Sequence, residues 1–181
     1  MRVFVAIDLP DEIKARLHEI SSALFTYGVA PVDSDLYHIT LQFLGNVKES
    51  ELDAIDKALG NVTRRKFSLS VEGVSFFSPK FLRVVFAGVS NGGSDAVGLY
   101  NEICGALSAH GVKYEKEHDY KPHATIARVK SAKNRNEIMN VIHEYRERRF
   151  GSFEVSEFVL KESVNVNGKV IYKSIRGYAL L

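Results

Sequence analysis

The sequence predicts a fold that mixes α-helices with β-strands, and three observations support this. Segments with the apolar pattern of strands alternate with amphipathic segments typical of helices. Two pairs of strand-like segments are joined by turns and look like hairpins, which breaks the alternation. A short motif, His-x-Thr followed by an aliphatic residue, occurs twice, with the two histidines 85 residues apart. Strand–helix alternation alone would favour parallel β-α-β units.

Individual elements follow from residue patterns. The opening run RVFVAIDL is apolar and β-branched, which predicts a buried strand. Strands are expected over Arg2–Leu9, Leu36–Leu44, Phe67–Val74, Leu82–Val89, His123–Val129, Phe153–Leu160 and Val170–Leu180. Apolar residues at helical spacing predict helices over Asp11–Phe25, Glu49–Leu59, Asp95–Ala109 and Asn134–Arg149. Loops or turns are expected at Gly28–Ser34, Gly45-Asn46, Ser75–Phe81, Ser90–Ser94 and Asn165–Gly168.

Length and composition indicate an ordinary globular chain. With 181 residues, 45% hydrophobic and 25% charged, we expect a single domain over residues 1–181 that is able to form two lobes. The formal net charge of +2 permits a polyanionic partner without requiring one. No apolar stretch is long enough to span a membrane, and Asp8 interrupts the apolar start, so neither a membrane span nor a signal peptide is expected.

The single cysteine excludes an intrachain disulfide and a four-cysteine zinc site. Cys104 lies among Leu99, Ile103 and Leu107 at helical spacing, which predicts a buried thiol. A chain without disulfides fits a reducing cytoplasm. No HExxH or similar pattern is present, so we expect no metal and no cofactor. No obligate protein partner is indicated.

The two motifs are the strongest functional signal. They read His38-Ile39-Thr40-Leu41 and His123-Ala124-Thr125-Ile126. On a strand, histidine and threonine share one face while the aliphatic residues point to the core. Two such strands facing each other would present two imidazoles and two hydroxyls to one cleft. One imidazole could take a proton from water and the other could protonate a leaving oxygen, because the ordinary histidine pKa is about 6.5.

These residues resemble a known family. The two motifs, the opening MRVFVAIDLP, the run HITLQFLG and the run KPHATIAR are similar to the RNA 2′,3′-cyclic phosphodiesterases, also called the 2′-5′ RNA ligase family, within the two-histidine phosphoesterase superfamily. The resemblance covers nearly the whole chain. It implies a bilobal α+β fold with pseudo-two-fold symmetry, in which each lobe has an antiparallel sheet backed by helices and the motifs face each other across a central cleft.

The same resemblance implies an activity and its residues. The reaction would open a 2′,3′-cyclic phosphate at an RNA end to a 2′-phosphate, without a metal, and 2′-5′ ligation of RNA halves would run the same steps backward. His38, Thr40, His123 and Thr125 would be the catalytic groups. An arginine of the family pattern is matched by Arg128. Strict alternation would turn Arg128 away from His123, so we expect a local break in the strand that brings its charge to the phosphate.

Other residues carry weaker expectations. Tyr37 and Tyr120 flank the motifs and could either stack on a base of the substrate or pack in the core. The remaining histidines, His18, His110, His118 and His143, lack the strand context and are expected at the surface or at helix caps.

Sequence neighbours suggest a division of labour between the two imidazoles. The cations Lys121 and Arg128 near His123 would favour its neutral form as the base. The carboxylates of Asp33 and Asp35 near His38 would favour its protonated form as the acid.

Three functions remain open at this point. The first is the RNA-end phosphodiesterase. The second is hydrolysis of 2′-5′ oligonucleotides or of small cyclic nucleotide phosphates. The third is a non-catalytic RNA-binding module, against which two intact proton carriers argue. Turnover of a cyclic-phosphate-ended oligonucleotide in EDTA would separate catalysis from binding.

Overall fold

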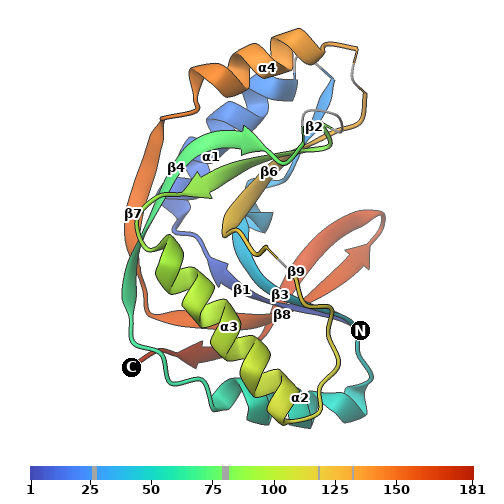
Figure 1. Ribbon diagram of the computed structural model, residues 1–181. Helices are drawn as coiled ribbons and strands as arrows, with labels where there is room; N and C mark the ends of the chain where they lie inside the picture. The colour runs from blue at the N-terminus through green and yellow to red at the C-terminus, as the bar shows by residue number, and fades with distance from the viewer. Residues whose placement is uncertain (26–27, 79–81, 118, 132) are drawn as a thin grey trace.

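A computed structural model describes residues 1–25, 28–78, 82–117, 119–131 and 133–181. Within them, nine strands form one strongly curled sheet (Figure 1). The strands are β1 (Arg2–Asp8), β2 (Val29–Pro31), β3 (His38–Asn46), β4 (Phe67–Phe76), β5 (Val84–Val89), β6 (His123–Val129), β7 (Arg149–Val155), β8 (Glu157–Val166) and β9 (Lys169–Ala179). The helices are α1 (Asp11–Phe25), α2 (Leu52–Gly60), α3 (Gly93–Ala109) and α4 (Arg135–Glu144), with short 3-10 helices at Ser34–Leu36 and Glu49–Glu51.

The sheet consists of two halves that meet at the strands carrying the motifs. Strand order is β7-β4-β5-β6-β3-β1-β8-β9, with β2 paired to β6. All of these pairs are antiparallel, so the parallel arrangement suggested by strand–helix alternation is wrong, and the α+β expectation is confirmed. The halves join at one register pair, Ile39 with Ala124. The two lobes therefore share one continuous sheet instead of having separate sheets.

Each half of the sheet is covered by one pair of helices. Helices α1 and α4 contact each other and lie against strands β4, β6 and β7, while α2 and α3 contact each other and α3 lies against β3 (Figure 1). The buried residues form one cluster that runs through both halves. It includes Ile39 and Leu41 behind the first motif and Ala124 and Ile126 behind the second, each at most 1% exposed. As expected for strands, the aliphatic residues of each motif anchor it to the core.

Several predicted boundaries are wrong. The predicted helix 134–149 ends at Glu144, and the predicted strand 153–160 is divided between β7 and β8. Strand β7 pairs with β4 and β8 pairs with β1, so Ser156 is the one residue between strands of opposite halves. Both segments have strand-like composition, and their local pattern does not show which partner each will choose.

Some turn and loop predictions differ from the structure. The residues Gly45-Asn46 continue β3 and pair with β1, where a turn was expected. The predicted loop 28–34 contains the short strand β2. The loop predicted over 75–81 falls partly on residues 79–81, which lie outside the described residues. No helix among the described residues is long and apolar enough to cross a membrane.

Candidate active site

Both motif strands carry a bulge at the same place. In β3, Thr40 pairs with Ala6 and Gln42 with Val5, so Leu41 is an extra residue. In β6, Thr125 pairs with Phe86 and Ala127 with Val85, so Ile126 is the extra residue. Each bulge lies three residues after the histidine and reverses the alternation beyond it. The fifth residue after each histidine therefore points to the same side as the histidine.

The bulges place Phe43 and Arg128 in equivalent positions of the two halves. Both residues line the central cavity, together with His38, Thr40, His123 and Thr125. The expected break in alternation before Arg128 is thus confirmed. Arg128 and Phe43 also distinguish the two halves, since one presents a guanidinium group and the other an aromatic ring.

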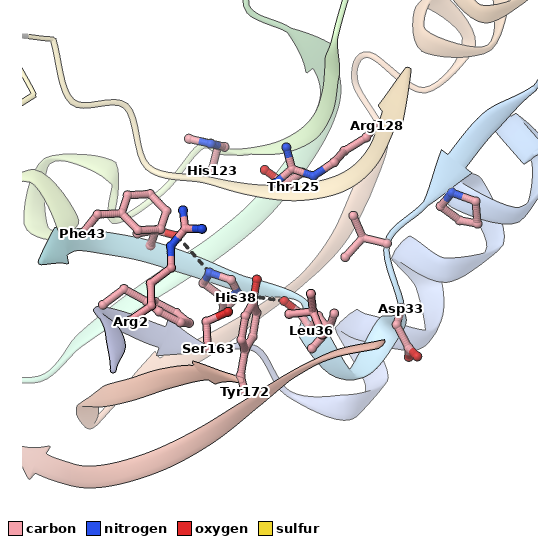
Figure 2. Close-up of a pocket in the computed structure, with 15 residues that line it drawn as sticks. Arg2, Asp33, Leu36, His38, Phe43, His123, Thr125, Arg128, Ser163 and Tyr172 are labelled. Atoms are coloured by element: carbon pink, nitrogen blue, oxygen red, sulfur yellow. Dashed lines mark hydrogen bonds between the residues drawn. The ribbon is translucent and has the colours of Figure 1, made fainter. Parts of the chain in front are cut away.

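The cavity has a volume of about 430 Å³ and opens between the two halves of the sheet (Figure 2). The motif strands contribute its centre, and β1, β8 and β9 supply a second wall that sequence reasoning missed. The residues of this wall are Arg2, Phe4, Ser163, Val170 and Tyr172. Nothing in their local pattern signals a site. Phe43, by contrast, could have been found by extending the repeat beyond His-x-Thr-aliphatic to the position of Arg128.

The two imidazoles are oriented by the same backbone contact. Nδ1 of His38 lies 2.7 Å from the carbonyl oxygen of Leu36, and Nδ1 of His123 lies 2.7 Å from that of Lys121. A carbonyl only accepts hydrogen bonds, so Nδ1 carries the proton in both rings and Nε2 is left for chemistry. In His38, Nε2 is 2.9 Å from the Thr40 hydroxyl, which can donate to it.

His38 is enclosed by aromatic rings. The rings of Phe4 and Tyr172 have centroids 5.0 and 5.2 Å from the imidazole, and Tyr172 meets it edge-on at 85°. Burial lowers the pKa of His38 below its ordinary value, and the positive charge of Lys161 lowers it further, against the opposing effects of the Leu36 carbonyl and Asp8. Because removal from water disfavours the charged form, this environment favours the neutral form of His38.

This environment overturns the electrostatic argument made from sequence neighbours. The carboxylate of Asp33 is 2.9 Å from Lys169, and Asp33 does not hold His38 protonated. Near the other motif, Lys121 pairs with Asp119 at 3.0 Å. Distance along the chain therefore misassigned the charges that act on His38.

His123 has a different setting. Its ring meets Phe77 edge-on with centroids 4.7 Å apart and lies 5.1 Å from Phe86. In the described part of the chain, Nε2 of His123 has no hydrogen-bond partner, in contrast to Nε2 of His38. The two imidazoles are thus similar in orientation but differ in enclosure.

Neither tyrosine predicted to bind substrate lines the cavity. Tyr37 is 1% exposed within the core, so its ring has no free face for a base. The Tyr120 ring stacks on Tyr100 with centroids 4.2 Å apart, and its hydroxyl donates to the Thr40 carbonyl oxygen at 2.8 Å. Of the two roles expected, core packing is therefore confirmed for Tyr37, while Tyr120 is partly buried and has one face of its ring covered by Tyr100. Tyr120 instead holds the strand that carries the first motif.

The other singled-out residues lie away from the cavity. His18, His110 and His143 are exposed, and His118 lies outside the described residues. Cys104 is buried as predicted, with its thiol 3.4 Å from the Gln42 side-chain oxygen. Among the described residues, no group of three or more His, Cys, Asp or Glu side chains is arranged to hold a metal ion.

A curled antiparallel sheet that brings two His-x-Thr motifs to one cavity defines the class of two-histidine phosphoesterases. Comparison with protein-family models agrees with this class, since residues 7–85 and 90–172 match the model for LigT-like phosphoesterases. The chain belongs to the LigT-like phosphoesterase family.

Individual relatives cover the chain almost completely. An RNA 2′,3′-cyclic phosphodiesterase of Archaeoglobus fulgidus is 37% identical over 97% of this chain and 98% of its own length. One from Methanocaldococcus jannaschii is 33% identical over 97% of this chain and 99% of its own. Among solved structures, ligand-free LigT of Escherichia coli is similar with a TM-score of 0.79 and 26% identity, over 99% of this chain and 96% of that one.

Proposed function

We propose that this protein hydrolyses 2′,3′-cyclic phosphates at RNA ends to 2′-phosphates. The observation that carries the proposal is the pair of Nδ1-anchored imidazoles, His38 and His123, lining one cavity with an arginine. This arrangement supplies a proton acceptor, a proton donor and a cation, which an in-line displacement at phosphorus needs. The relatives' activity on RNA 2′,3′-cyclic phosphates supports the choice of substrate.

The proposed reaction divides the protons between the two rings. Neutral His38 accepts a proton through Nε2 from a water molecule, whose oxygen attacks phosphorus. His123, in its protonated form, donates from Nε2 to the ribose O3′ as the bond between phosphorus and O3′ breaks. The burial that lowers the pKa of His38 supports its role as the base, which reverses the assignment made from sequence neighbours.

The hydroxyl groups and Arg128 complete the proposed site. Thr40 and Thr125 donate hydrogen bonds to the non-bridging phosphate oxygens, and the Arg128 guanidinium balances their charge. Thr40 now donates to His38, so substrate binding redirects its hydroxyl. If a 5′-hydroxyl group of RNA replaced water as the attacking group, the same steps would form a 2′-5′ linkage. RNA with a cyclic phosphate end is the proposed partner, and the cytoplasm, in keeping with the single buried cysteine, is the proposed location.

The test is hydrolysis of a cyclic-phosphate-ended oligonucleotide in EDTA by the wild-type protein and by His38→Ala and His123→Ala. We expect turnover without added metal and a loss in kcat of about 10²-fold or more in each variant, the scale for a lost general acid or base. The loss in kcat should be smaller in Thr40→Ala and Thr125→Ala than in the two histidine variants. Exposed His18→Ala is the matched control for a lost imidazole.

Other results of this assay would favour a different function or mechanism. Binding of the oligonucleotide without turnover would favour an RNA-binding module. Preference for 2′-5′-linked oligonucleotides or for small cyclic nucleotides would favour the second activity. Turnover only with Mg²⁺ or Mn²⁺ would overturn the proposed mechanism.

A further inference from the structure

Arg2 is a second cation of the cavity that the proposed reaction does not use. It projects from the first strand, β1, into the same cavity as Arg128. Figure 2 shows the two guanidinium groups on opposite sides of the two imidazoles. Arg2 therefore approaches the centre of the cavity from the side of Phe43, and Arg128 approaches it from the side of Thr125.

The charge of Arg2 is not neutralised by the protein. In the described part of the chain neither Arg2 nor Arg128 forms an ion pair. The nearby carboxylates are already used, since Asp8 binds Lys161 at 2.8 Å and Asp33 binds Lys169 at 2.9 Å. An arginine directed into a cavity without a counterion is suited to an anion from outside.

The backbone of Arg2 is held firmly, which aims its side chain. Arg2 pairs with Asn46 on one side and with Ser163 on the other. Its neighbour Met1 exchanges two further hydrogen bonds with Val47, from the terminal amine at 3.0 Å and to the carbonyl at 2.8 Å. A cation fixed by strands on both sides loses less freedom on binding than one on a loop.

The two ends of the cavity differ in how well they suit a polyanion. Figure 2 places Asp33 toward the Arg128 end, and Asp33 is the only acidic residue among the described residues that line the cavity. Among the described residues that line the cavity, none at the Arg2 end carries a carboxylate, and Phe43 there is 57% exposed and accessible for stacking on a base. A nucleotide that precedes the reacting end therefore finds a cation without an ion pair and an exposed aromatic ring together at the Arg2 end.

We propose that Arg2 binds the phosphodiester that links the terminal nucleoside to the preceding nucleotide of the RNA chain. This inference rests on the proposed function, and it adds that the cavity distinguishes a chain end from a free nucleotide. A nucleoside 2′,3′-cyclic monophosphate lacks the linking phosphate, so Arg2 has nothing to bind in it. A dinucleotide with a cyclic phosphate end is the smallest substrate that reaches both arginines.

The experiment compares three substrates that differ only upstream of the reacting phosphate. They are adenosine 2′,3′-cyclic monophosphate, the adenylyl dinucleotide with a 2′,3′-cyclic phosphate end, and the same dinucleotide with a neutral methylphosphonate linkage. The variants are Arg2→Gln, Arg128→Gln and, as a charge-matched control, Arg65→Gln, an exposed residue between α2 and β4. Circular dichroism checks that each variant is folded.

For Arg2→Gln, we expect kcat/KM on the phosphodiester dinucleotide to fall about tenfold more than on the other two substrates, the scale of one hydrogen bond to a charged group. Arg128→Gln should lower kcat/KM to the same extent on all three substrates. Arg65→Gln should leave kcat/KM unchanged on each of them. Equal losses on all three substrates in Arg2→Gln, or no loss on any, would overturn the inference while leaving the proposed function intact. If the wild-type protein hydrolyses none of the three, the proposed function fails and the inference falls with it.

Discussion

At the scale of single residues, the enclosure of His38 is the feature with the clearest chemical consequence. A base with an ordinary pKa of about 6.5 is partly protonated near neutrality, and enclosure shifts the balance toward the neutral form. Phe4 and Tyr172 supply this enclosure, and neither belongs to a motif. The residues that tune the proposed base thus come from β1 and β9, far from it in sequence.

Tyr172→Ala tests this tuning. Removing the ring admits water to His38, so the pKa of His38 should rise toward its ordinary value, and the acidic limb of the kcat/KM profile should move to higher pH with it. Histidine resonances followed by NMR during a pH titration give the pKa directly. Tyr172→Phe keeps the ring and serves as the control. An unchanged His38 titration in Tyr172→Ala would show that this ring does not shield the imidazole.

At the scale of elements, helix α3 supports the strand that carries the first motif. It lies against β3, and its Cys104 contacts Gln42 there. Glycines in the left-handed conformation stand at both ends of this helix, Gly92 before it with φ 77° and Gly111 after it with φ 69°. At the second end, Val112 donates to the Leu107 carbonyl oxygen at 3.0 Å, which closes the helix in a Schellman turn.

These two glycines should differ in their tolerance of a side chain. A Cβ at Gly111 meets no atom within 4 Å, so Gly111→Ala should cost only the backbone penalty of about 1 kcal/mol. A Cβ at Gly92 would collide with the backbone carbonyl of Ser68, so Gly92→Ala should cost about 3 kcal/mol or more. Urea unfolding of both variants measures the difference. Equal losses would mean that the Ser68 backbone moves aside at little cost.

Elements with a local sequence signal were predicted correctly, whereas elements that depend on strand pairing were not. The motif strands, their polar faces and the bulge before Arg128 were all expected, because alternation and a repeated motif are local signals. The missed division of 153–160 into β7 and β8 has no local signal, since partner choice depends on the rest of the sheet. The choice between base stacking and core packing stayed open for Tyr37 and Tyr120 for a related reason, because sequence does not distinguish an aromatic ring beside a site from one beneath it.

At the scale of the whole molecule, the helices cross between the halves of the sheet. Helix α1 follows β1 but lies against β6 and β7, and α3 follows β5 but lies against β3. Each half is therefore covered by a helix that follows a strand of the other half, although among the described residues β3 and β6 pair at the single register position of Ile39 and Ala124. The shared core extends through both halves. We propose on these grounds that residues 1–181 unfold as one cooperative domain.

The last prediction tests this cooperativity with one reporter in each half. The chain contains no tryptophan, so a single introduced indole reports only on its surroundings. Phe153 in β7 and Leu52 in α2 are partly buried against the core in opposite halves, which makes Phe153→Trp and Leu52→Trp suitable probes. Fluorescence unfolding in urea should give each variant a midpoint that coincides with its own circular dichroism transition. Lobes held together only through the Ile39–Ala124 pair would separate first, and the fluorescence and circular dichroism transitions would then diverge. Because the exchanged helices tie each half to the other, we expect the two transitions to coincide in both variants.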